Sequence, residues 1–136
     1  MAYLETLTSQ IVTALQNNGL TVFTEYELQT APVPSAPKFV TIAAEQMQTG
    51  AQLPYPNGTA MPVTLRLRFR LHGLPDSDPD ELAILWELCI LPELVQNGYP
   101  MTDTALGELR YVRQLDRIVR EGTVQMPALL TRTSSD

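Results

Sequence analysis

The sequence predicts an α+β fold in which helices pack on one face of a mostly antiparallel sheet of about four strands. The strongest evidence is residues 63–72, where apolar and polar side chains alternate without a break, as in a strand with one buried face. Residues 82–95 are apolar on nearly all sides, which indicates a buried helix. The 136 residues, 44% hydrophobic and 18% charged, suit one domain spanning 1–136.

The N-terminal part of the chain is expected to contribute a helix and two strands. A helix is predicted over 3–17, and Asn17-Asn18-Gly19 is a typical helix end. Strands are predicted over 20–28 and 38–45, with a proline-rich connection between them because proline cannot donate to a sheet ladder. The apolar residues that define the helix recur at spacings of three and four: Leu4, Leu7, Ile11 and Leu15.

A long connection is predicted over 46–62, between the second strand and the alternating one. It contains Gly50, two prolines and the pair Asn57-Gly58, which suits a tight hairpin turn. A loop of this length inside a compact domain is often functional or mobile. The family resemblance described below would make it a candidate contact surface.

The C-terminal half begins with a helix that is predicted to start near Pro79, with Asp78 as its cap, and to end at Asn97-Gly98. Residues 104–120 fit either a helix or a strand leading into a hairpin, and we favour the helix. A closing strand is predicted over 123–131, on an edge of the sheet because it contains proline. The last residues, from 131 onward, are expected to fray.

Cysteine content and hydropathy indicate a cytoplasmic protein. The single cysteine, Cys89, lies in an apolar run and can form no disulfide within the chain, which suits a reducing compartment. Residues 1–5 lack the features of a secretory signal. The longest apolar stretch, 82–95, is interrupted by Glu87 and Glu93, so no membrane span is expected.

No catalytic, metal or cofactor site is expected, and we predict that the protein is not an enzyme. The only histidine, His72, ends the alternating strand, and its expected place is the exposed face. No nucleophile turn or glycine-rich phosphate loop is present. The acidic run 76–81 resembles part of a calcium loop, but Glu81 stands where the sharp turn needs glycine.

The alternating strand carries the most informative feature, a stripe of three arginines: Arg66, Arg68 and Arg70. The net charge of −6 makes nucleic acid an unlikely partner, because phosphate binding needs an excess of basic residues. One interpretation is an exposed face that binds an acidic partner or a second copy of the chain. The other is a face neutralised by carboxylates of neighbouring strands, with three candidates: Glu25, Glu27 and Glu45.

The all-round apolar helix gives a second indication of self-association. A domain of this size cannot easily bury every side of a helix. Either the sheet covers one side and the first helix the other, or part of the helix is buried between subunits. Trp86 is the predicted anchor of such an interface, with Tyr3 and Tyr99 as further aromatic candidates.

The order of these elements resembles the small tail-terminator and head–tail joining (neck) proteins of long-tailed phages. The resemblance rests on the amphipathic start Leu4–Leu15 with its Asn-Asn-Gly end, and on the strand Val63–Leu71 that runs through Asp76–Asp80 into the helix Glu81–Val95. It covers most of the chain at the level of element order, and it contains no diagnostic motif.

The resemblance implies a structural protein without catalysis, which assembles in the bacterial cytoplasm as a homo-oligomeric ring, commonly of six copies. Such rings cap a tail tube or join tail to head in a virion or prophage-derived particle, so other tail or head–tail proteins are the implied partners. No functional residue of the family carries over to this chain. The alternative is a small cytosolic ligand-binding or regulatory domain.

Overall fold

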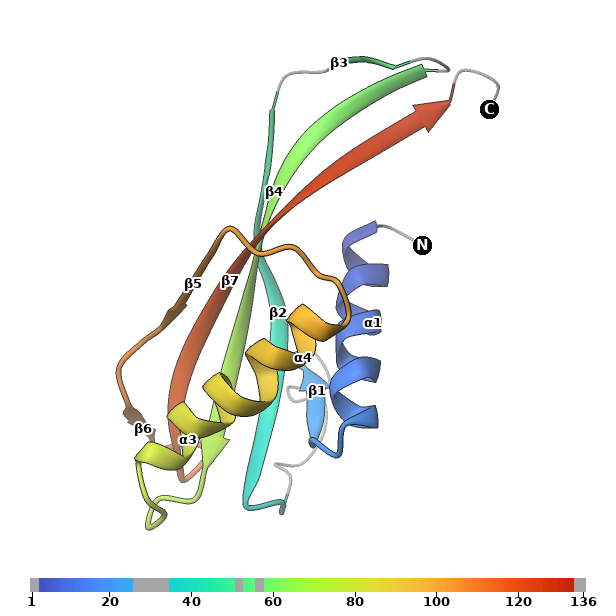
Figure 1. Ribbon diagram of the computed structural model, residues 1–136. Coiled ribbons are helices and arrows are strands. Elements are labelled where there is room, and N and C mark those ends of the chain that lie inside the picture. The colour runs from blue at the N-terminus through green and yellow to red at the C-terminus, as the bar shows by residue number, and fades with distance from the viewer. Residues whose placement is uncertain (1–2, 26–34, 51–52, 56–57, 134–136) are drawn as a thin grey trace.

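Helices cover one face of a seven-stranded sheet in the computed structural model, which describes residues 3–25, 35–50, 53–55 and 58–133 (Figure 1). The elements follow in the order α1 (Tyr3–Asn17), β1 (Val22–Thr24), β2 (Lys38–Thr49), β3 (Leu53–Tyr55), β4 (Gly58–Gly73), α3 (Asp80–Ile84), the π-helical turn η1 (Leu85–Ile90), α4 (Leu91–Gln96), β5 (Asp103–Leu106), β6 (Arg110–Val112) and β7 (Arg117–Thr133).

The sheet has the strand order β1-β2-β4-β7-β5, with β3 also beside β4 and β6 also beside β7. Only β1 and β2 run parallel, so the predicted antiparallel character is confirmed. The predicted number of about four strands is too low. The additional strands lie in segments that were interpreted as a loop and as a helix.

Strand β4 supplies the centre of the core, as its alternation predicts. Leu65, Leu67, Phe69 and Leu71 are completely buried on the face that the helices cover. Helix α1 packs its buried residues Leu7, Ile11 and Leu15 toward this core. It ends at Asn17 as predicted, and Gly19 follows with a φ of +87°, a left-handed conformation that glycine adopts without strain. Of the strand predicted over 20–28, Val22–Thr24 is β1, while residues 26–28 lie outside the described residues.

The helix predicted to start near Pro79 is present, as α3, η1 and α4 in succession. A carboxylate oxygen of Asp78 accepts the backbone N–H of Asp80 at 3.0 Å, which is the predicted capping contact. The wider π-helical turn of η1 comes just before Pro92. Because proline has no N–H for the usual bond within a helix, we attribute the change of winding to it.

The helix favoured over 104–120 is wrong. This segment holds β5, β6 and the start of β7, with a turn over 113–116 in which Asp116 has a φ of +49°. The helical spacing of its apolar residues is overridden by long-range pairing, because β7 pairs with β4 from Ile118 to Thr133. The closing strand is therefore much longer than predicted, and of the expected frayed tail only 134–136 lie outside the described residues.

The long loop predicted over 46–62 is also largely strand. Residues 46–49, 53–55, 58–65 and 126–133 form a β-arm that projects beyond the N-terminal end of α1 (Figure 1). Pro62 is tolerated here because its nitrogen faces a position just beyond the end of β2, where no ladder bond is required. On the same side, its carbonyl oxygen accepts the N–H of Gly50 at 2.7 Å.

Candidate interaction surfaces

The three arginines of the predicted stripe lie on the sheet face opposite the helices, and each has a carboxylate partner within the chain. Arg68 donates two hydrogen bonds to Glu25, at 3.0 and 2.7 Å. Arg70 Nε lies 2.9 Å from Glu121 and 3.6 Å from Glu25. Arg66 Nε lies 3.2 Å from a Glu45 oxygen, without the alignment of a hydrogen bond.

The contacts of Arg68 and Arg70 join into one network, because Glu25 bridges these two arginines and Glu121 bridges Arg70 to Arg110 at 3.2 Å, while the pair of Arg66 and Glu45 stands beside it. The hydrogen bond to Glu25 raises the pKa of Arg68. Burial alone would raise the pKa of Glu121, but the hydrogen bond from Arg70 and the nearby arginine charges outweigh it and lower this pKa. The network explains how successive like charges are tolerated on one strand.

The neutralised-face interpretation is thus confirmed for two of its three candidates, Glu25 and Glu45, while Glu27 lies outside the described residues. Sequence reasoning missed Glu121, because its segment was interpreted as helix. Placing 117–133 on a strand beside β4 would have set Glu121 directly across from Arg70. Binding of a partner by this face stays a prediction.

The expected exposed position of His72 is wrong. The side chain follows the strand alternation onto the arginine face, but it is only 1% exposed. Its ring stacks on Phe39 with centroids 4.2 Å apart, and the guanidinium of Arg117 lies over the same Phe39 ring at 5.2 Å. Burial, followed by the charges of Arg70 and Arg117, lowers the pKa of His72 to about 4, so the ring is neutral at pH 7.

The polar atoms of this cluster are only partly satisfied. His72 Nε2 lies 3.4 Å from the Thr41 hydroxyl, while Nδ1 is buried and has no hydrogen-bond partner among the described residues. Arg117 donates to the carbonyl oxygens of Ala36 and Pro37 at 2.8 and 3.0 Å, which fixes the connection before β2 to the sheet. The contacts of the cluster are those of a second, small core on this face.

Trp86, the predicted interface anchor, lies in the core of its own chain and is 5% exposed. The ring meets Phe69 edge to face with centroids 5.6 Å apart, and it packs on Gly122 of β7. A Cβ at position 122 would come within 2.5 Å of the ring, so the glycine provides the space that Trp86 fills. Of the other aromatic candidates, Tyr99 lines a surface groove, and the side chain of Tyr3 lies outside the described ones.

The β-arm carries an apolar face that the helices leave uncovered. Met47, Leu65 and Met126 lie side by side across β2, β4 and β7, and Met61 lies on the same face nearer the tip. Met47 is 40% exposed and Met61 is partly exposed, whereas Leu65 and Met126 are buried where the arm joins the core. Three of the five methionines thus share one face, and methionine adapts readily to different contact surfaces.

A second exposed apolar surface lies on the solvent side of the α3–η1–α4 helix. Ile84, Leu88 and Val95 are 51%, 67% and 63% exposed, and we call them the helix stripe. Their spacings of four and seven residues place them on one side of the helix. Within the described chain, therefore, neither the sheet nor the first helix covers this part of the apolar helix.

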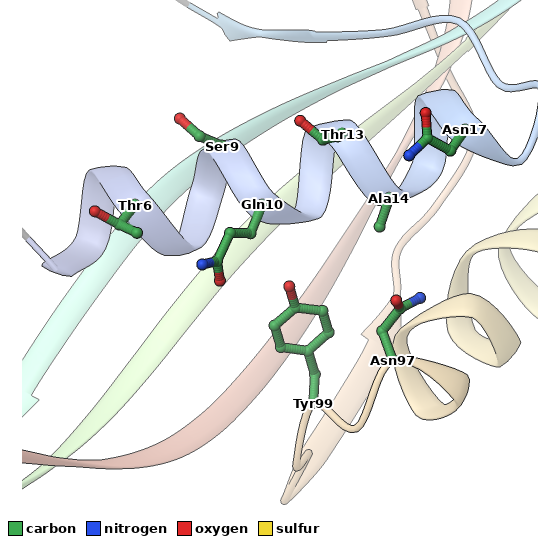
Figure 2. Close-up of a pocket in the computed structure, with 8 residues that line it drawn as sticks. All are labelled: Thr6, Ser9, Gln10, Thr13, Ala14, Asn17, Asn97 and Tyr99. Carbon is green, nitrogen blue, oxygen red and sulfur yellow. The ribbon is translucent and has the colours of Figure 1, made fainter.

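A groove of about 400 Å³ separates α1 from the end of α4 (Figure 2). It is open to solvent. All but one of its lining side chains, Ala14, carry a hydroxyl or an amide, and Tyr99 forms one of its walls. Within the described residues no three His, Cys, Asp or Glu side chains come together as a metal site. The groove therefore offers hydrogen-bonding groups without a charged group.

No protein-family model matches this chain, and no curated protein matches its sequence. In the described part of the chain, no helix is both long and apolar enough to cross a membrane.

Proposed function

We propose that the protein is a structural, non-enzymatic assembly protein that forms a ring in the tail of a phage or prophage, as a tail terminator or a head–tail joining protein. The observation that carries the proposal is the β-arm, which extends the apolar face of the sheet past the end of α1 (Figure 1). Exposed apolar surface of this kind is typical of sites where proteins associate.

The element order adds support. The amphipathic helix α1, the proline-containing connection, the hairpin between β2 and β4, and the capped helix after β4 follow one another as in the phage proteins that the sequence resembles. The cytoplasm of a bacterial host is the proposed place of assembly, and other tail or head–tail proteins are the proposed partners.

The alternative of a small cytosolic ligand-binding or regulatory domain has weaker support. Such a domain usually offers an enclosed, mostly apolar pocket with a few polar groups that orient the ligand. The groove between α1 and α4 has a mostly apolar lining surface, but it is open to solvent and does not enclose a ligand. The arm and the helix stripe, by contrast, expose large apolar side chains.

The proposal is tested by measuring absolute mass in solution by light scattering after size exclusion, over a range of protein and salt concentrations. Six copies of the 15.1 kDa chain give about 90 kDa, and particles of that mass should appear as rings in negative-stain micrographs. Contacts through the apolar surfaces should persist in high salt, whereas contacts through the arginine face should weaken. A chain that stays monomeric at every concentration would refute the proposal.

A further inference from the structure

The chain exposes two apolar surfaces at different places, and neither can cover the other within one copy. The apolar face of the β-arm projects past the end of α1, while the helix stripe lies on the solvent side of the α3–η1–α4 helix (Figure 1). Each surface can therefore be covered only by another molecule. Because the surfaces differ, a contact that joins the arm of one copy to the stripe of another leaves the pair with one free arm and one free stripe, to which further copies can add.

Charge identifies the regions through which two copies can approach. Each copy has a net charge of −6, so contact between two acidic surfaces is opposed by electrostatic repulsion, which is smaller where one of the two surfaces is uncharged. The sequence from 46 to 65, which includes β3 and the arm portions of β2 and β4, contains no charged residue, and neither does 122–131 of β7. The arm is therefore an extended uncharged surface that can approach the acidic helix of a second copy, which carries Glu87 and Glu93.

The dimensions of the two surfaces match. From Ile84 to Val95 the stripe is about 16 Å long at the rise of an α-helix. The arm portion of β4, from Leu65 at its buried base to Thr59, is about 20 Å long at the rise of an antiparallel strand. The face has methionines at its exposed positions, and their flexible side chains can pack around the branched side chains of the stripe.

We propose that the β-arm of one copy covers the helix stripe of the next copy, in a head-to-tail contact in which Met47 and Met61 meet Ile84, Leu88 and Val95. This inference rests on the proposed function, since it names the surfaces that join the copies of the ring. A head-to-tail contact closes into a ring when the rotation between neighbours allows it. The ion-paired arginine face stays outside this contact.

The test uses two charge variants, Met47→Glu in the arm and Leu88→Glu in the stripe. Each alone should lose assembly and run at 15.1 kDa, because a carboxylate would be buried against an apolar surface. An equimolar mixture should form a species of about 30 kDa, since one intact arm and one intact stripe remain. Gln48→Glu, on the opposite face of β2, and Leu109→Glu, at an exposed leucine elsewhere, should assemble like the wild type.

The outcomes separate this inference from the proposed function. Assembly of both charge variants at wild-type mass would overturn the arm–stripe contact and leave the ring proposal standing. A mixture no heavier than its components would also overturn it, provided that thermal unfolding shows each variant folded. Met47→Gln, which removes apolar contact without adding charge, replaces the glutamate variant if that variant unfolds, and it should weaken assembly in the same direction. A monomeric wild type would overturn both proposals.

Discussion

Replacing His72 with phenylalanine should remove most of the dependence of stability on pH between pH 7 and pH 5. His72 is the only histidine of the chain, so no other side chain has an ordinary pKa in this range. In the folded chain the ring is buried and stacks on Phe39, and burial, followed by the charges of Arg70 and Arg117, lowers its pKa from 6.5 to about 4. Below pH 6.5 the unfolded chain thus takes up a proton that the folded chain does not.

The sign and size of the effect follow from this difference. The free energy of unfolding rises with pH wherever the unfolded state binds more protons. For pKa values of 6.5 unfolded and about 4 folded, lowering the pH from 7 to 5 should cost about 2 kcal/mol of stability. Glu121, whose pKa is lowered, also loses stabilisation in acid, but mainly below its ordinary value of 4.5.

Urea unfolding at several pH values, at one low protein concentration that keeps assembly constant, measures the effect. The wild type should lose stability steadily from pH 7 to pH 5, and His72→Phe, which retains an aromatic ring against Phe39, should lose much less. NMR titration of the imidazole in the folded chain is an independent check. A folded-state pKa near 6.5, or a variant with the wild-type slope, would refute the burial argument.

Three further substitutions test other parts of the structure. Gly122→Ala should lower the free energy of unfolding by about 1–3 kcal/mol, because its Cβ would meet the Trp86 ring at 2.5 Å. In the double variant, Trp86→Leu should recover part of this loss. If the losses of the two single variants simply add, the packing argument is contradicted. Arg68→Ala should cost about 1 kcal/mol, less in high salt, through its two bonds to the partly exposed Glu25. Arg66→Ala should change the free energy of unfolding by less than about 0.5 kcal/mol, since the single ion pair of Arg66 is not aligned as a hydrogen bond and is more exposed. Urea unfolding measures both losses. A larger loss for Arg66→Ala than for Arg68→Ala would disprove the pairing argument.

Local periodicity predicted the elements in which local and tertiary preferences agree. The alternation in β4 and the spacing in α1 each describe one uninterrupted buried face. The cap at Asp78 is a contact made within a few residues. The strand from Arg117 to Thr133 could not be recognised in the same way. Its first residues follow helical spacing and its later ones include Pro127, and its stability comes from pairing along the whole length of β4.

The candidate surface was predicted in part. The arginine stripe and two of its partners follow from strand parity and charge, whereas Glu121 required knowledge of which strand lies beside β4. The burial of Trp86 depends on Gly122, thirty-six residues further along the chain, and no local pattern marks that contact. Likewise, His72 obeys the predicted parity, but its ring stacks on Phe39 of the neighbouring strand β2, a contact that no local pattern marks.

The edge of the β-arm supplies a further argument for association. In the described chain β7 is paired on both sides only as far as Gln125, where β5 begins its pairing, and from Met126 onward it pairs with β4 alone. Proteins commonly protect exposed strand edges with charged residues or proline. Here Pro127 provides one such block, but no charge follows before Arg132. If this edge were exposed to water, charged residues at these positions would increase solubility. Their absence therefore favours an arm that a second copy covers.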